Sequence, residues 1–172
     1  VVEYIVKATV RKALDGKAPK DASRRRLIDP ACGSGSFLLV AYQELLDWHR
    51  KWYGEDGPDR HPRALYRTAA GDWRLTIEER KRVLLNSIYG VDVDPQAVEV
   101  TKLSLLLKVL EGETDQTLHS QYRLFHKQRA LPDLGRNIKC GNSLIGPDIY
   151  ADRLLGDEER LIINAFDWHR EF

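Results

Sequence analysis

One ten-residue stretch limits the possible folds of this chain more than any other feature. It is Asp29-Pro30-Ala31-Cys32-Gly33-Ser34-Gly35-Ser36-Phe37-Leu38. A short apolar run at residues 27–28 precedes it and is typical of the end of a buried strand, and an apolar pattern with helical spacing begins at Ser36. Gly33 and Gly35 predict a tight turn between them, because glycine adopts backbone conformations that other residues avoid. A strand, a glycine turn and a helix form a layout that binds nucleotide-like ligands, since free N–H groups at a helix start attract negative charge.

The spacing of the glycines separates the possible ligands. A dinucleotide fingerprint requires a third glycine three residues after the second, and Leu38 stands at that position. This argues against a nicotinamide-dependent oxidoreductase, which is one of two alternative functions for the chain. An acidic residue at the strand end followed by Gly-x-Gly instead resembles the pattern of enzymes that use S-adenosylmethionine.

The composition is that of one folded domain over residues 1–172. Apolar residues make up 42% of the chain and charged residues 31%, which suits a domain with its own core. No apolar run approaches the roughly 20 residues of a membrane helix, and no signal peptide begins at Val1. Because the first residue is not methionine, we expect an excised piece of a longer protein. The net charge of +1 predicts that most of any DNA-binding surface lies elsewhere in that protein.

The cysteines and histidines favour neither a disulfide scaffold nor a metal site. Cys32 and Cys140 are the only cysteines and form no Cys-x-x-Cys motif, which fits a reducing compartment and predicts a cytoplasmic protein. His49, His61 and His119 lack the i, i+4 spacing of a helical metal site. We therefore expect them to be ordinary surface or capping residues.

Hydrophobic periodicity predicts alternating helices and strands. Helices are expected over residues 1–14, 36–53 and about 95–110, and strands at about 27–29, 88–92 and 137–141. The helix at 95–110 is heavily apolar and is expected to be mostly buried. The tryptophans at 48 and 52 lie on the apolar face of the helix at 36–53, so we expect core packing there rather than stacking on bases.

The segment between the first two strands is long. Residues 54–75 are charged and interrupted by glycine and proline, which is typical of an insertion or extended loop. Thr76-Ile77-Glu78-Glu79 then has the pattern of a capping box at the start of a further helix. Loop and helix together predict an insertion at about 54–87.

Asp92 is the second candidate binding residue. It ends the predicted strand at 88–92, where a carboxylate can accept hydrogen bonds from both hydroxyls of a ribose. The alternative role of a helix cap suits Asp94 better, because Pro95 follows it at the first helical position. Asp92 lies 63 residues after Asp29, against about 20 in the simple fingerprint. The insertion accounts for the difference.

Three stretches in order resemble the motifs of N6-adenine-specific DNA methyltransferases of restriction–modification systems. The ten-residue stretch resembles their motif I, Gly90-Val91-Asp92-Val93-Asp94-Pro95 resembles motif II, and Gly141-Asn142-Ser143-Leu144 resembles motif III. Phe166-Asp167-Trp168 resembles the segment before their fourth strand. The resemblance implies an α/β, partial Rossmann-like methyltransferase fold: a parallel sheet in the order 3-2-1, helices on both faces, and truncation before strand 4.

The resemblance also implies a binding site for S-adenosylmethionine. In it, the glycine turn would bind the cofactor together with a ribose-binding acid, an adjacent apolar residue and an amide that accepts from the adenine amine. The residues carried over are Asp29, Ala31, Cys32, Gly33, Ser34, Gly35, Phe37, Asp92, Val93, Asn142 and Ser143.

The chemistry of methyl transfer needs a further motif. The target adenine must be flipped out of the duplex. In the methyltransferase family that the chain resembles, an Asn/Asp-Pro-Pro-Tyr/Phe motif after the fourth strand holds the amine of that adenine. No Asn-Pro or Pro-Pro pair occurs in this sequence, and neither cysteine forms the Pro-Cys pair of a C5-cytosine enzyme. We therefore expect the cofactor-binding half of an adenine methyltransferase, inactive alone, whose DNA contacts lie mostly outside this chain. The second alternative is a non-catalytic domain that docks onto restriction or specificity partners.

Overall fold

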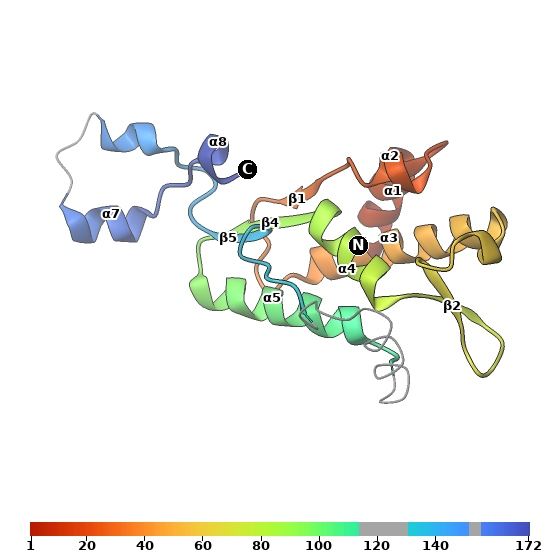
Figure 1. The fold of residues 1–172 in the computed structure, drawn as a ribbon. Helices are drawn as coiled ribbons and strands as arrows, with labels where there is room; N and C mark the ends of the chain where they lie inside the picture. Colours follow the sequence, from red (N-terminus) through yellow and green to blue (C-terminus); the bar gives the residue numbers. More distant parts are fainter. Residues whose placement is uncertain (114–130, 152–155) are drawn as a thin grey trace.

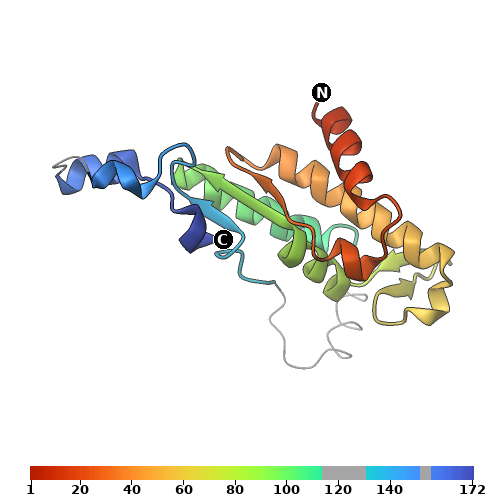
Figure 2. The ribbon, with the colours of Figure 1, turned by 90° about the horizontal axis from the view of Figure 1, so that it is seen from above.

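Three parallel strands form the centre of the molecule in a computed structural model that describes residues 1–113, 131–151 and 156–172. The strands are β1 (Leu27–Asp29), β4 (Ile88–Asp92) and β5 (Ile138–Cys140), which lie side by side in the order β1-β4-β5 (Figure 2). This confirms the predicted 3-2-1 order. Asp29 pairs with Gly90, and Asp92 pairs with Cys140. The carboxyl ends of all three strands therefore meet at one edge of the sheet.

One face of the sheet is covered by long helices. These are α3 (Ser36–Glu55) and α5 (Pro95–Leu110), and α1 (Val2–Leu14) packs on α3 (Figure 1). Gly90 faces α3 so closely that a Cβ on it would lie 2.8 Å from Leu38 Cδ1. Side chains between the sheet and these helices form the hydrophobic core, which includes Val6, Leu38, Leu45, Leu84, Ile88, Leu105 and Ile138.

The other face carries an aromatic cluster beside the short helix α8 (Trp168–Glu171). Tyr89 alternates with Gly90 along β4 and so points to this face, where its ring lies 5.6 Å from that of Phe172. The rings of Phe166 and Trp168 complete the cluster at 4.9 Å from each other. Ile28 on the neighbouring strand stays 45% exposed. Helices therefore lie on both faces, but this face has only one short helix from the described part of the chain.

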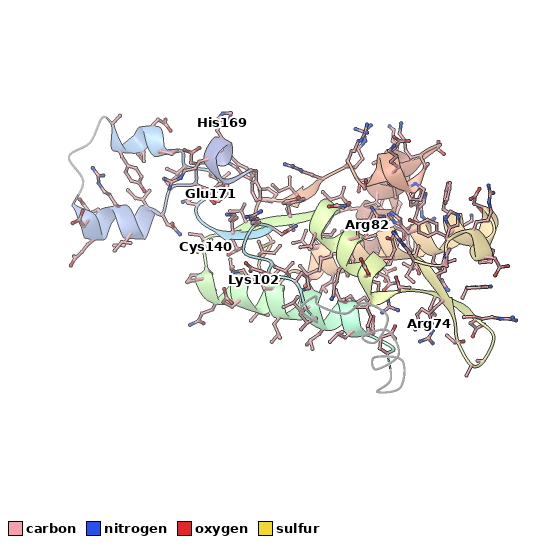
Figure 3. The ribbon with its side chains drawn as sticks, in the orientation of Figure 1. Arg74, Arg82, Lys102, Cys140, His169 and Glu171 are labelled. Carbon is pink, nitrogen blue, oxygen red and sulfur yellow. The ribbon has the colours of Figure 1, made fainter. Side chains whose placement is uncertain are left out.

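The predicted insertion contains a β-hairpin that the sequence pattern did not reveal. Its strands are β2 (Leu65–Arg67) and β3 (Trp73–Leu75), preceded by a short 3-10 helix, η1 (Pro58–Arg60), and followed by α4 (Ile77–Ser87). Strands of three residues with a charge in each do not produce a readable alternation. Figure 3 shows Arg74 on this hairpin and Cys140 at the end of β5, on opposite sides of the central part of the molecule.

Arginines of the insertion bind the carboxyl end of α5. Arg74 Nη1 donates to the carbonyl of Gly112 over 2.7 Å, and Arg80 Nη1 donates to that of Glu111 over 2.8 Å. The hydroxyl of Tyr66 donates to a carboxylate oxygen of Glu113. Arg80 Nη1 also donates to the carbonyl of Val109, in the last turn of α5, which has no intrahelical partner. These bonds hold the hairpin and α4 against the end of α5.

The predicted helix caps at Thr76 and Asp94 are confirmed, but the reciprocal half of the capping box is not. The Glu79 carboxylate binds Tyr53 and Arg82, and the Thr76 N–H donates to the carbonyl of Ala64. The Thr76 hydroxyl accepts from the Glu79 N–H at the start of α4, over 3.2 Å. The Asp94 carboxylate accepts from the Gln96 N–H at the start of α5, over 2.9 Å, with Pro95 at the first helical position. Further short elements are α2 (Pro19–Ala22), η2 (Pro147–Tyr150) and α7 (Asp157–Ile163).

The expectation that residues 95–110 are mostly buried is wrong. The stripe of α5 that faces the core is Val98, Thr101, Leu105 and Val109. On its outer side Val100, Leu103 and Leu107 are 49%, 58% and 60% exposed. Apolar content therefore overestimated the contacts that neighbouring elements make with this helix.

The interpretation of His49 as a surface or capping residue is also wrong. Its side chain is 1% exposed, and Nδ1 lies 2.8 Å from the carbonyl of Leu45. The ring packs edge-on against Trp48, with centroids 4.8 Å apart. Burial of the ring lowers the pKa of His49. His61 is half-buried and contacts Asp56 over 2.8 Å, and His119 lies outside the described residues.

The predicted core packing of the two tryptophans is confirmed in part, since Trp48 and Trp52 are half-buried against the hydrophobic core. Within the described ranges, no helix combines the length and the apolarity needed to cross a membrane.

Candidate functional site

The turn between β1 and α3 depends on its two glycines. Gly33 and Gly35 have φ of +52° and +82°, in the left-handed region that other residues avoid. The N–H of Gly35 donates to the carbonyl of Cys32 over 2.8 Å and closes the turn. A Cβ on Gly35 would lie 2.8 Å from Thr101 Cγ2, whereas a Cβ on Gly33 would have no described atom within 4 Å. The turn is thus packed on the Gly35 side and open on the Gly33 side.

The carboxylate of Asp92 reaches this turn from the neighbouring strand. Asp92 Oδ2 accepts from the N–H of Gly33 over 2.7 Å, and Oδ1 accepts from the N–H of Asp94 over 3.0 Å. The side chain is half-buried. A carboxylate has about four acceptor positions, so these two bonds leave room for a ligand's hydroxyl groups.

The other residues of the turn differ in what they can offer. Asp29 Oδ1 accepts from the N–H of Ala31 over 3.1 Å, which shapes the start of the turn. Cys32 is 5% exposed, and its N–H donates to the carbonyl of Val91 over 3.0 Å. Burial raises the pKa of the Cys32 thiol to about 11, and the nearby carboxylates of Asp92 and Asp29 add to the rise. The thiol is therefore neutral and buried, so Cys32 would contact a ligand mainly through its backbone.

Two further predicted residues flank the turn. Ser34 is exposed, and Phe37 is half-buried against the core from the first turn of α3. Phe37 therefore acts at least in part as a packing residue. The exposed Ser34 borders the open side of the turn.

The loop after β5 adds an amide to the same edge. Gly141 donates its N–H to the carbonyl of Asp92 over 2.8 Å, so this loop starts beside the tip of β4. Asn142 Oδ1 accepts from the N–H of Leu144 over 3.2 Å, and its backbone N–H donates to the carbonyl of Asn164. The carbonyl of Ser143 accepts from Trp168 Nε1 over 3.0 Å.

An apolar surface lies between the acid and the amide. Val93 follows Asp92 directly and is 53% exposed. Cys140, which is exposed at the end of β5, has its sulfur 3.6 Å from the carbonyl of Val93. The structure therefore brings three predicted groups to one edge: the glycine turn, Asp92 with Val93, and the loop of Asn142 and Ser143.

Sequence reasoning missed two residues that hold this edge. The hydroxyl of Thr101, buried on α5, donates to the carbonyl of Gly33 over 2.7 Å. Asn164 adopts φ of +45°, and its carbonyl accepts from Asn142. A single polar residue on the otherwise apolar stripe of a helix was the only sequence signal for Thr101. Nothing in the sequence pattern marked Asn164.

A separate hollow of about 320 Å³ lies between α3, the hairpin and the carboxyl end of α5. Its lining is largely charged and includes Asp47, Arg50, Arg74, Arg80 and Lys108. Because α5 has 16 residues and is about 24 Å long, this hollow is remote from the glycine turn at the other end of the helix. The described residues contain no cluster of three or more histidine, cysteine or acidic side chains suited to a metal.

Comparison with known proteins identifies the family to which this chain is similar. Residues 10–146 match the family model described as MmeI, DNA-methyltransferase domain. The type II restriction enzyme and methyltransferase RM.Eco57I of Escherichia coli is 32% identical over 167 residues, which are 97% of this chain and 15% of that protein.

Two further relatives are similar over shorter regions. The putative type II restriction enzyme and methyltransferase RM.MjaORFECS2P of Methanocaldococcus jannaschii is 36% identical over 121 residues, covering 70% of this chain and 9% of that protein. The adenine-specific methyltransferase PglX of Streptomyces coelicolor is 28% identical over 118 residues, which cover 69% of this chain and 8% of that protein. The chain thus spans between 8% and 15% of the length of these three relatives.

These matches confirm the resemblance to methyltransferases of restriction–modification systems that the three motifs indicated. With the family model covering most of its length, this chain belongs to the family of MmeI DNA-methyltransferase domains.

Proposed function

We propose that this chain binds S-adenosylmethionine as the cofactor-binding part of an enzyme that methylates N6 of adenine in DNA, within a restriction–modification system. The observation that carries the proposal is the 2.7 Å contact between Asp92 Oδ2 and the N–H of Gly33. It joins the acidic tip of β4 to the glycine turn after β1. In parallel α/β sheets, ligands bind outside the carboxyl ends of the strands, where this contact lies.

The groups at this edge fit the parts of the cofactor. The open side of Gly33 and the first N–H groups of α3 suit the methionine end, whose carboxylate is negative. The free acceptor positions of Asp92 suit the ribose hydroxyls. The exposed Val93 would contact the face of the adenine ring, and the loop of Asn142 and Ser143 would lie at its exocyclic amine.

We infer that residues 1–172 form one domain with an insertion at about 54–87. The hairpin and α4 within that insertion lie away from the glycine turn, with α4 packed along α3 between Tyr42 and Tyr53 (Figure 1). On this proposal they support the core and do not touch the cofactor.

Methyl transfer itself draws on residues outside the candidate site. A bound cofactor would supply an activated methyl group, and residues beyond the candidate site would hold the amine of a flipped-out adenine toward it. The sequence has no Asn-Pro-Pro-Tyr motif to hold that amine, so we propose that the chain alone binds cofactor without methylating DNA. The relative named as adenine-specific favours adenine as the target base. The net charge of +1 gives this chain little basic excess, so we propose that most DNA contacts lie outside these 172 residues.

Calorimetric titration with S-adenosylhomocysteine tests the proposal, with NADH as the control ligand. The unaltered chain is expected to bind S-adenosylhomocysteine and not NADH. Asp92→Asn should weaken binding by about 1.5–3 kcal/mol, because a hydrogen bond to a charged group is lost.

Asp94→Asn is the matched control. It makes the same change of charge two residues away, and asparagine keeps the helix cap. It should bind like the unaltered chain. The proposed binding site would be overturned if the folded chain did not bind S-adenosylhomocysteine. It would also be overturned if Asp92→Asn and Asp94→Asn lost equal affinity.

The second candidate function is a non-catalytic docking domain of a restriction–modification assembly. The exposed Val100, Leu103 and Leu107 on the outer side of α5 favour it, because apolar stripes of this kind often mark contact surfaces. The same titration separates the two candidates, since a docking domain has no need to bind the cofactor.

A further inference from the structure

The buried stripe of α5 contains one polar side chain. Of its four residues, Val98, Leu105 and Val109 are aliphatic, and only Thr101 carries a hydroxyl. Thr101 is 0% exposed, so its hydroxyl needs a partner within the protein. That partner is the carbonyl of Gly33, which lies 68 residues earlier in the sequence and accepts over 2.7 Å.

The same side chain also contacts the second glycine of the turn. A Cβ built on Gly35 would lie 2.8 Å from Thr101 Cγ2 and 2.9 Å from its Oγ1. Thr101 therefore closes the packed side of the turn with its methyl group and binds the turn with its hydroxyl.

Both backbone groups of Gly33 are held from neighbouring elements. Asp92 accepts from its N–H, and Thr101 donates to its carbonyl. Glycine loses more conformational freedom on ordering than any other residue, so two such bonds determine how the turn is presented. The open side of Gly33 then faces outward in one fixed orientation.

We propose that Thr101 is a positioning residue for the cofactor-binding turn, acting through Gly33 rather than by touching the ligand. This inference rests on the proposed function. Without the hydroxyl, the turn would sample several conformations. Part of the binding free energy would then be spent on ordering the turn. Affinity for the cofactor should therefore fall even though none of its contacts is removed.

The test compares substitutions that differ in one group. Thr101→Val keeps the shape and removes the hydroxyl, and Thr101→Ala and Thr101→Ser both remove the methyl and differ only in the hydroxyl. S-adenosylhomocysteine affinity is measured by calorimetry. Deuterium uptake of the segment 29–36 is measured without ligand, and stability by urea unfolding.

Thr101→Val is expected to bind about five- to tenfold more weakly, as for a lost hydrogen bond. Thr101→Ser should bind at least threefold more tightly than Thr101→Ala, and Thr101→Val should speed deuterium uptake in the turn. If Thr101→Val does not fold, the Ser and Ala pair carries the test.

Thr76→Val is the control for a purely structural effect. Thr76 is also buried and its hydroxyl is also bonded, at the start of α4. It should lose stability and keep full affinity. Binding by the unaltered chain with no loss in Thr101→Val, or an equal loss in Thr76→Val, overturns this inference alone. No binding by the unaltered chain overturns the proposed function and the inference with it.

Discussion

The hydroxyl of Tyr53 donates to Glu79 Oε1 over 2.7 Å and joins α3 to α4. Glu79 is 6% exposed, and Arg82 binds both of its carboxylate oxygens, over 2.6 and 2.7 Å. A buried carboxylate is stable only when its oxygens are satisfied, and this one has partners on two helices. Burial raises the pKa of the Tyr53 hydroxyl, so it remains a donor at any ordinary pH.

Removing that hydroxyl should therefore destabilise the chain. Tyr53→Phe is expected to lower the free energy of unfolding by about 1.5–3 kcal/mol, the usual worth of a hydrogen bond to a charged group. Tyr4→Phe is the control, because Tyr4 is 78% exposed and should change little. Urea unfolding of both variants checks this. Similar losses in the two would show that the contact with Glu79 contributes nothing.

The two glycines of the turn should respond differently to alanine. Both have positive φ, so each substitution carries a strain of about 1–2 kcal/mol. Only at Gly35 would the new Cβ also meet Thr101, at 2.8 Å. Gly35→Ala should therefore destabilise by clearly more than Gly33→Ala in urea unfolding. The reverse order would mean that the packing between α5 and the turn is not as described.

Stability should fall on mild acidification because of His49. Burial lowers its pKa in the folded chain, whereas in the unfolded chain it titrates near the usual value of about 6.5. The unfolded state therefore takes up a proton first, and stability present above about pH 6.5 is lost as the pH falls below it.

His49→Gln should flatten the slope of unfolding free energy between pH 7 and pH 5. Parallel pH profiles of the unaltered chain and His49→Gln would contradict the assignment of the slope to His49.

Arg80 should contribute more to stability than surface arginines do. Its guanidinium donates to the carbonyls of Val109 and Glu111 and pairs with Glu113 at 3.4 Å, with its side chain 11% exposed. Arg80→Gln should cost about 2–4 kcal/mol, because it leaves buried partners unsatisfied. Arg24→Gln, at an exposed site, should cost under about 0.5 kcal/mol. Thermal unfolding at several salt concentrations measures both.

The elements that sequence reasoning found are those that local chemistry specifies. The strand, glycine turn and helix around Gly33, and the caps at Thr76 and Asp94, depend on residues within a few positions of each other. The spacing of apolar residues also predicted where the three strands lie in the chain, while their order in the sheet came from the family resemblance. These features need no knowledge of what lies far along the chain.

What sequence reasoning missed depends on distant neighbours. The partner of Thr101 is 68 residues away, and the charges that act on the buried His49 are those of Glu79 and Arg82 on α4. The outer side of α5 looks like core in the sequence because apolar residues surround the helix, and only the folded chain shows that Val100, Leu103 and Leu107 are exposed. Asparagine tolerates the positive φ that Asn164 adopts at the end of α7, but the N–H that its carbonyl accepts belongs to Asn142 in a distant loop.

Hydrogen bonds hold helix α5 at both ends. They limit how its length can change in evolution. Asp94 and the turn contact of Thr101 fix one end, and Arg74 and Arg80 bind the other. One inserted residue would rotate everything beyond it by about 100° and carry one set of contacts out of reach. Among the described residues, the hydrogen bonds of the hairpin tip at 68–72 stay within the hairpin itself. Related chains should therefore vary in length at that tip, while the span from Asp94 to Gly112 keeps a constant number of residues.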